Sequence, residues 1–192
     1  LKYKEANPDN ESLENIELES AKNLYFSQQY NAAIGAFEDY EKNYASSPLS
    51  IQAKFYRAES HYRLNNTEKA LELYYELDRE AQATDIDIVF QRIGELQLKN
   101  GDFGEAVNYY AKLEKIAASK RQENEAWLGL LEGYFRLSNF EEARYYARLL
   151  IEKGNISQEV VNKANLYIGK THYLEGDYDT AIDNFLTTIN IA

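Results

Sequence analysis

The side chains best suited to acid–base or metal chemistry near neutral pH are two histidines, His61 and His172. They lie 111 residues apart, and each comes nine residues before an alanine that recurs along the chain. A zinc site or a general base needs further polar neighbours, and no such set is evident around either histidine. We therefore interpret both as packing residues near the seam between paired helices.

Other motifs for catalysis are also missing from the sequence. The chain has no Cys, which excludes thiolate nucleophiles, disulfides and cysteine-ligated metals. It lacks the G-x-S-x-G nucleophile elbow and the G-x-x-x-x-G-K-[ST] phosphate loop. The glycine-rich segment Gly101-Asp102-Phe103-Gly104 falls in an expected turn, and nothing singles out one carboxylate pair for acid–base work. We expect no enzyme activity, no cofactor and no metal.

The composition narrows the classes of partner. The 192 residues include 21 Lys and Arg against 32 Asp and Glu, so the formal net charge is −11. An acidic chain is a poor match for nucleic acid, whose binding needs a positive field. No stretch approaches the roughly 18 apolar residues of a membrane-spanning helix. No proline follows Pro48, so proline forbids helices nowhere in the later part of the chain.

Five alanines recur at near-constant spacing, which indicates internal repeats. The separations are 37, 36, 37 and 38 residues. The recurring alanines are Ala33, Ala70, Ala106, Ala143 and Ala181. A small residue stands twelve positions before four of them, and an aromatic residue stands four positions after four of them. Small residues let two helices approach closely, and the aromatic residue fills the space toward the next helix.

A turn signal precedes four of the recurring alanines. Gly or Asn can adopt the left-handed conformation that ends a helix, and Asp or Asn can cap the next one. These signals are Asn65-Asn66, Gly101-Asp102-Phe103, Ser138-Asn139-Phe140 and Gly176-Asp177-Tyr178. Each repeat is therefore expected to be a helix, a tight turn and a second helix, and such pairs must stack to bury their apolar faces.

These residues resemble the tetratricopeptide repeat family, whose signature is W-x2-L-G-x2-Y followed by A-x3-F and a closing Pro. The best match to the first part is Trp127-x2-Leu130-Leu131-x2-Tyr134. The A-x3-F element occurs from Ala33 to Phe37 and again in the last repeat. The resemblance implies an all-α fold, a right-handed tetratricopeptide-repeat solenoid of about ten antiparallel helices.

The sequence departs from the family pattern in three ways. The closing Pro is absent, and the period exceeds the usual 34 residues, which indicates longer second helices or longer connections. Leu131 stands where the family has a small residue, while the aromatic position of the same repeat holds Ala147. We interpret this pair as a size exchange that conserves core volume.

The organisation expected along the chain is a polar linker or frayed start over 1–11 and one solenoid domain over 12–192. Its repeats are expected at about 13–46, 48–83, 85–119, 121–155 and 157–192. The expected helices are 12–28, 30–45, 49–64, 67–82, 85–99, 103–118, 121–137, 140–153, 157–174 and 178–190. Because Ile189, Ile191 and Ala192 form no polar cap, we expect the array to continue or to be covered by another subunit.

The resemblance places the first helix of each repeat along a concave groove. Eight positions before each recurring alanine stands a large apolar or aromatic residue: Tyr25, Tyr62, Leu98, Phe135 and Tyr173. Such a stripe either packs between neighbouring helices or anchors a bound peptide, since Tyr gives a large contact area at low entropy cost.

Charged residues run beside the stripe as three i, i+4 pairs, expected on an exposed helix face. The pairs are Glu59 with Arg63, Glu95 with Lys99, and Glu132 with Arg136. Glu on the N-terminal side is the better orientation, worth about 0.2–0.5 kcal/mol. The groove columns carry six basic and four acidic residues, namely Lys22, Arg63, Lys99, Arg136, Lys163 and Lys170 against Glu59, Glu95, Glu125 and Glu132. The face is either a solvated, self-paired surface or a peptide-binding site.

Three functions remain open. The chain is a non-enzymatic scaffold that binds a peptide or partner helix in the groove, an assembly subunit of a bacterial envelope complex, or the regulatory segment of a longer enzyme or signalling protein. The segment Tyr44-x3-Pro48-x-Ser50-x2-Ala53 resembles the inter-repeat joint of bacterial envelope tetratricopeptide proteins, which favours the periplasm or envelope over the cytoplasm. Self-association through the array ends is a further expectation. Leu18 and Lys22 replace the Lys and Asn of the subclass that binds chaperone tails, so we expect no such binding.

Overall fold

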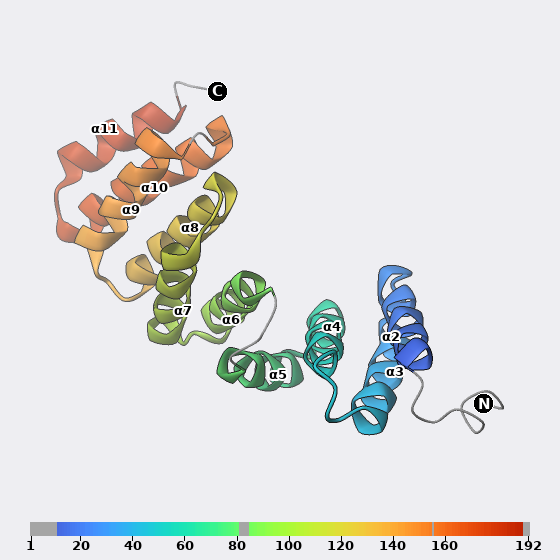
Figure 1. The fold of residues 1–192 in the computed structure, drawn as a ribbon. Helices are drawn as coiled ribbons and strands as arrows, with labels where there is room; N and C mark the ends of the chain where they lie inside the picture. The colour runs from blue at the N-terminus through green and yellow to red at the C-terminus, as the bar shows by residue number, and fades with distance from the viewer. Residues whose placement is uncertain (1–10, 81–84, 155, 190–192) are drawn as a thin grey trace. The chain divides into compact units, whose positions relative to one another are not determined.

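The computed structural model describes residues 11–80, 85–154 and 156–189, and these residues form ten α-helices (Figure 1). The helices are α2 (Glu11–Phe26), α3 (Tyr30–Asn43), α4 (Ser50–Arg63), α5 (Thr67–Arg79), α6 (Ile86–Asn100), α7 (Phe103–Ile116), α8 (Lys120–Arg136), α9 (Phe140–Lys153), α10 (Gln158–Glu175) and α11 (Tyr178–Ile189). The all-α prediction is confirmed, and the helix ends agree with the expected ones within three residues. The predicted linker over 1–11 lies outside the described residues except for Glu11, which begins α2, and the chain end over 190–192 also lies outside them.

The chain divides into two compact units, residues 1–86 and 87–192. We call them the N-terminal unit, which contains α2 to α5, and the C-terminal unit, which contains α6 to α11 except the first residue of α6. Within each unit, helices that follow one another along the chain pack together, as α9, α10 and α11 do side by side in Figure 1. The expectation of a single solenoid domain stays a prediction.

The turns inside the helix pairs share one backbone feature. A residue with positive φ lies five positions before every recurring alanine: Gln28, Asn65, Gly101, Ser138 and Gly176. This confirms the left-handed helix ends, although Ser138 rather than Asn139 adopts that conformation. Asp102 accepts a hydrogen bond from the backbone N–H of Glu105 at 3.1 Å, as a helix cap does. Asn66 and Asn139 occupy the N-cap positions of α5 and α9 as expected, but neither side chain makes a capping hydrogen bond.

Glycines allow the paired helices of the C-terminal unit to approach closely. A Cβ atom at Gly94 on α6 would lie 2.8 Å from the Tyr110 ring of α7, and one at Gly169 would lie 2.5 Å from Phe185. A Cβ at Gly129 on α8 would also overlap the Tyr110 ring. This ring therefore lies between glycines of two successive first helices. The predicted role of the aromatic residue in joining repeats is confirmed here.

The next repeat builds the same region with other residue sizes. Leu131 and Ala147 are both buried in a cluster around Trp127, and Tyr167 of α10 packs against that cluster. The larger Leu131 thus accompanies the smaller Ala147 in one packed core, as a size exchange requires. In the N-terminal unit, Phe37 on α3 instead stacks on Tyr56 of α4, with ring centroids 6.0 Å apart.

Candidate functional site

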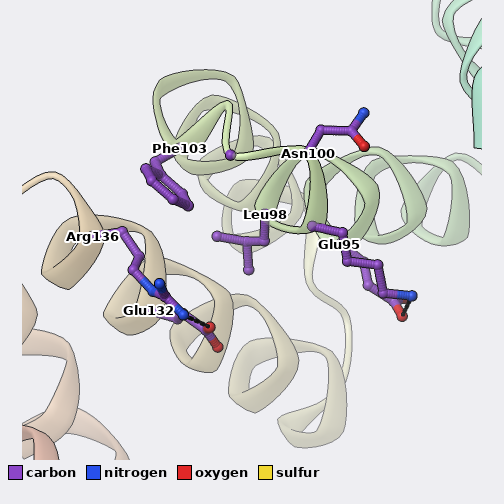
Figure 2. A pocket seen from close by; sticks show the side chains of 8 residues that line it. Glu95, Leu98, Asn100, Phe103, Glu132 and Arg136 are labelled. Carbon is purple, nitrogen blue, oxygen red and sulfur yellow. Dashed lines mark ion pairs between the residues drawn. The ribbon is translucent and has the colours of Figure 1, made fainter.

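A pocket of about 550 Å³ lies on the first-helix face of the C-terminal unit (Figure 2). Its lining includes five of the groove residues predicted from sequence. The complete lining is Glu95, Leu98, Lys99, Asn100, Gly101, Phe103, Glu132 and Arg136. Figure 2 shows Leu98 pointing from α6 toward the pair formed by Glu132 and Arg136 on α8. The structure therefore brings the predicted residues of two repeats together around one hollow.

Helical spacing explains why these side chains share a face. Glu95, Leu98 and Lys99 stand at i, i+3 and i+4 on α6, while Glu132 and Arg136 stand at i and i+4 on α8. The predicted ion pairs form, with Lys99 Nζ 3.5 Å from Glu95 Oε1 and Arg136 Nη2 3.7 Å from Glu132 Oε1. The Lys99 and Arg136 side chains are 57% and 54% exposed. Long, exposed pairs of this kind are worth little, so a ligand can replace either partner.

Phe103 is a member of this site that the sequence analysis assigned only to a turn. It begins α7, and the Arg136 guanidinium lies 5.7 Å from the centroid of its ring. The ring gives the pocket an apolar wall beside a cation. A signal was present in the sequence, because an aromatic residue stands three positions before four recurring alanines: Tyr30, Phe103, Phe140 and Tyr178.

A second pocket, of about 310 Å³, extends the same face toward α10. It shares three residues with the first pocket, namely Glu95, Leu98 and Glu132. Its further lining residues are Gln91, Tyr110, Glu125, Leu128, Gly129 and Lys163. The predicted groove residue Lys163 thus lies where expected, on the first helix of the following repeat. We call the joined lining of the two pockets the α6–α8–α10 face.

The remaining stripe residues of the C-terminal unit do not line either pocket. Phe135 is half-buried, and its ring lies 5.0 Å from that of Tyr167 and 6.0 Å from that of Phe140. Burial raises the pKa of Tyr167, and the nearby charge of Glu132 adds to the effect. Tyr173 is 57% exposed and contacts Tyr178 at 5.5 Å between ring centroids. Within this unit, the stripe position therefore holds a packing residue at Phe135 and a surface residue at Tyr173.

The predicted groove residues of the N-terminal unit are Lys22, Tyr25, Glu59, Tyr62 and Arg63. Tyr25 lies in an aromatic cluster, with its ring centroid 5.2 Å from that of Tyr56 on α4. Burial raises the pKa of Tyr25, and the Glu59 carboxylate raises it further. Tyr62 is half-buried, with the Arg63 guanidinium 5.9 Å from its ring centroid.

Glu59 corrects the expectation of an exposed pair. Its residue is only 4% exposed, and its carboxylate accepts hydrogen bonds from the hydroxyls of Tyr74 at 2.5 Å and Tyr25 at 3.4 Å. The predicted partner Arg63 lies at the outer limit of an ion pair, 4.0 Å away. Glu59 therefore belongs to the buried polar contacts of its unit, because hydroxyl donors satisfy its charge where water cannot.

The two histidines lie in different units, and each contacts a residue in the turn that follows its own helix. His61 Nδ1 lies 3.3 Å from the side-chain amide of Asn66, and His172 Nδ1 lies 3.2 Å from Asp177 Oδ2. Burial lowers the pKa of His61, with a smaller contribution from Arg57. Within the described residues, no group of three or more His, Cys, Asp or Glu side chains has the geometry to hold a metal ion.

No helix in the described ranges is long and apolar enough to span a membrane.

The sequence matches the tetratricopeptide repeat family model over residues 18–84 and 92–158, which is more than half of the chain. These ranges include the later part of α2, all of α3 to α5, the later part of α6, all of α7 to α9 and the first residue of α10, and they confirm the resemblance drawn from the recurring alanines. No curated protein matches the sequence.

Solved structures match the fold along nearly the whole chain. MamA 41-end from Desulfovibrio magneticus RS-1 has 12% sequence identity and a TM-score of 0.70, covering 92% of this chain and 93% of that one. Another MamA structure has 13% identity and a TM-score of 0.74, covering 92% and 90%. A putative kinesin light chain from Podospora anserina with nearly identical TPR-like repeats has 13% identity and a TM-score of 0.67, covering 95% and 96%. The similarity is one of fold, and it confirms the predicted repeat solenoid.

Proposed function

Because the chain belongs to the tetratricopeptide repeat family, we propose that it is a non-enzymatic scaffold that binds a peptide or partner helix on the α6–α8–α10 face. The fold supports protein–protein interaction in general. The observation that carries the more specific proposal is the shared pocket on this face. It combines an apolar floor at Leu98, an aromatic wall at Phe103 and two exposed cations at Lys99 and Arg136.

The chemistry of the pocket selects for an apolar ligand with acidic groups. A ligand side chain can pack on Leu98 and Phe103, while its carboxylates displace Glu95 from Lys99 and Glu132 from Arg136. Each internal pair is separated by 3.5 Å or more, so its replacement costs little. A charge pair that forms across a binding surface contributes mainly to specificity and to the association rate.

The test is to reverse the two cations in a Lys99→Glu/Arg136→Glu variant and to compare captured proteins by affinity purification and mass spectrometry. A matched control, Lys115→Glu/Lys153→Glu, makes the same charge change on exposed positions of α7 and α9. We call the Lys99→Glu/Arg136→Glu protein the groove variant. We expect it to lose a subset of the partners that the wild-type protein and the control variant retain. Its melting temperature should stay close to that of wild type, because exposed pairs add little stability.

Retention of every partner by a folded groove variant would contradict the proposal. An isolated peptide from a lost partner then gives a second measurement, in which the groove variant should bind at least tenfold more weakly than the control at low salt. Equal affinities would place that partner on another surface.

A second candidate function is an assembly subunit of a bacterial envelope complex. The segment from Tyr44 to Ala53, which resembles the inter-repeat joint of envelope proteins, favours this candidate. In this segment the Ser50 hydroxyl donates a hydrogen bond to the Tyr44 carbonyl at 2.6 Å. An envelope or periplasmic location is part of the same proposal. Sequencing the complete gene tests it, since a secretion signal followed by a lipidation Cys supports envelope targeting and an appended catalytic domain supports a regulatory segment instead.

A further inference from the structure

An apolar stripe runs along the exposed side of α11. None of its residues lines the two pockets of the α6–α8–α10 face. Tyr178, Ile182 and Leu186 stand at i, i+4 and i+8, so helical geometry places them on one side. They are 59%, 53% and 48% exposed. Most large apolar side chains elsewhere in this unit are buried or half-buried. We call these three residues the α11 stripe.

The preceding repeats show what occupies the equivalent positions. Val107 on α7 corresponds to Ile182, and a Cβ at Gly133 of α8 would lie 2.6 Å from its Cγ2 atom. Arg144 on α9 also corresponds to Ile182, and it pairs with Glu175 of α10 at 2.5 Å. In both repeats this face of the second helix is the one that receives another helix. The α11 stripe has the shape and residue types of a helix-docking surface.

We propose that the α11 stripe binds an amphipathic helix of a partner protein, with an apolar row flanked by Lys or Arg. The charges beside the stripe lead to this choice. At about 100° per residue, Asp179 and Asp183 follow one edge of the stripe, and both are exposed. A helix that covers the stripe must lie against these carboxylates, and basic flanking residues would pair with them.

A second copy of the chain is a poorer occupant. An antiparallel, two-fold pairing of α11 with itself would place the row containing Asp179 and Asp183 against the same row of the other copy. Head-to-tail stacking would instead offer the outer face of α2. Four positions on this face of α2 and just after it are polar and exposed, namely Glu19, Ser20, Asn23 and Ser27. This face carries one exposed apolar side chain, Ile16 at 62%, and therefore offers the α11 stripe little apolar surface to bury.

The experiment uses three synthetic 18-residue peptides and the full chain. The first carries Leu at i, i+3, i+4 and i+7 spacing with Lys on both flanks, the second has Glu in place of Lys, and the third is a scrambled form of the first. We expect the Lys peptide to bind with the highest affinity in fluorescence anisotropy. An Ile182→Asp variant should bind it at least tenfold more weakly.

Ile16→Asp is the matched control, because Ile16 is also an exposed isoleucine, at 62%, but lies on α2 in the other unit. It should bind the Lys peptide as wild type does. A further variant, Asp183→Lys, should reduce the preference for the Lys peptide over the Glu peptide by at least fivefold. Circular dichroism checks that each variant keeps its helix content.

Equal binding of the Lys peptide and its scrambled form would overturn the proposal, since charge alone would then explain the binding. Equal binding to the Ile182→Asp and Ile16→Asp variants would overturn it as well. Sedimentation velocity gives the remaining outcome. A wild-type dimer that Ile182→Asp converts to a monomer would identify a second copy as the occupant and would overturn the choice of a basic partner.

Discussion

The two units use the same repeat position in different ways. Glu59 and Glu132 both stand eleven residues before a recurring alanine. In the N-terminal unit Glu59 is buried and accepts a hydrogen bond from Tyr74. In the C-terminal unit the Glu132 side chain is 31% exposed and pairs with Arg136 beside a pocket. One position therefore serves as an internal polar contact in one unit and as a surface charge in the other.

The two repeats also differ in the residue four positions after the recurring alanine. In the repeat of Glu59 this residue is Tyr74, whose hydroxyl reaches the carboxylate. In the repeat of Glu132 it is Ala147, which has no hydroxyl to donate. A buried carboxylate needs such donors, whereas a half-exposed one is solvated by water. The comparison teaches that a groove position in this family has to be judged together with its partner on the second helix.

The largest effect on stability is expected at the joints between repeats, which the two units build in different ways. Gly129→Val should lower the free energy of unfolding by about 3 kcal/mol, because a β-branched side chain would overlap the Tyr110 ring. The N-terminal unit joins α3 to α4 through stacked aromatic rings and needs no such glycine. Urea denaturation measures the change.

Gly35→Ala is the control, since a Cβ there meets no atom within 4 Å. It should stabilise α3 by about 0.5–1 kcal/mol through helix propensity. Similar destabilisation by the two substitutions would contradict the close contact assigned to Gly129.

A smaller effect on stability is expected at Glu59 and Glu132. Glu59→Leu should lower the free energy of unfolding by about 1–3 kcal/mol, because it leaves the Tyr74 hydroxyl buried without its acceptor. Glu132→Leu should change stability by less than about 0.5 kcal/mol, as expected for an exposed pair. Combining Glu59→Leu with Tyr74→Phe should recover most of the loss. If the double variant loses the full sum of the single effects, the two residues do not act as a pair.

The smallest effect concerns pH. Burial holds the pKa of His61 below its usual value, so the folded state binds the proton less readily than the unfolded state. Stability should therefore fall as the pH drops below about 6.5, by less than about 1 kcal/mol given that His61 is only half-buried. Thermal unfolding between pH 7.5 and 5 should show a weaker pH dependence for His61→Gln. An unchanged dependence in that variant would assign the effect to other groups.

The sequence by itself determined the repeats, the helices and most turns of this protein. Recurring small and aromatic residues mark which positions pack, and glycine or asparagine marks where two helices meet. These signals are local, because each depends on residues within one or two helical turns. For the same reason the i, i+4 pairs Glu95–Lys99 and Glu132–Arg136 form as expected.

Only the tertiary structure decided how deeply each groove residue lies and which residues surround the pocket. Glu59 and Glu132 carry the same local pattern, yet Glu59 is buried and accepts a hydrogen bond from Tyr74 on another helix, whereas Glu132 stays partly exposed. Phe103 joined the pocket because α8 brings Arg136 across from the turn that begins α7. Burial and pocket shape depend on the size and polarity of side chains from separate helices, and a pattern within one helix does not contain that information.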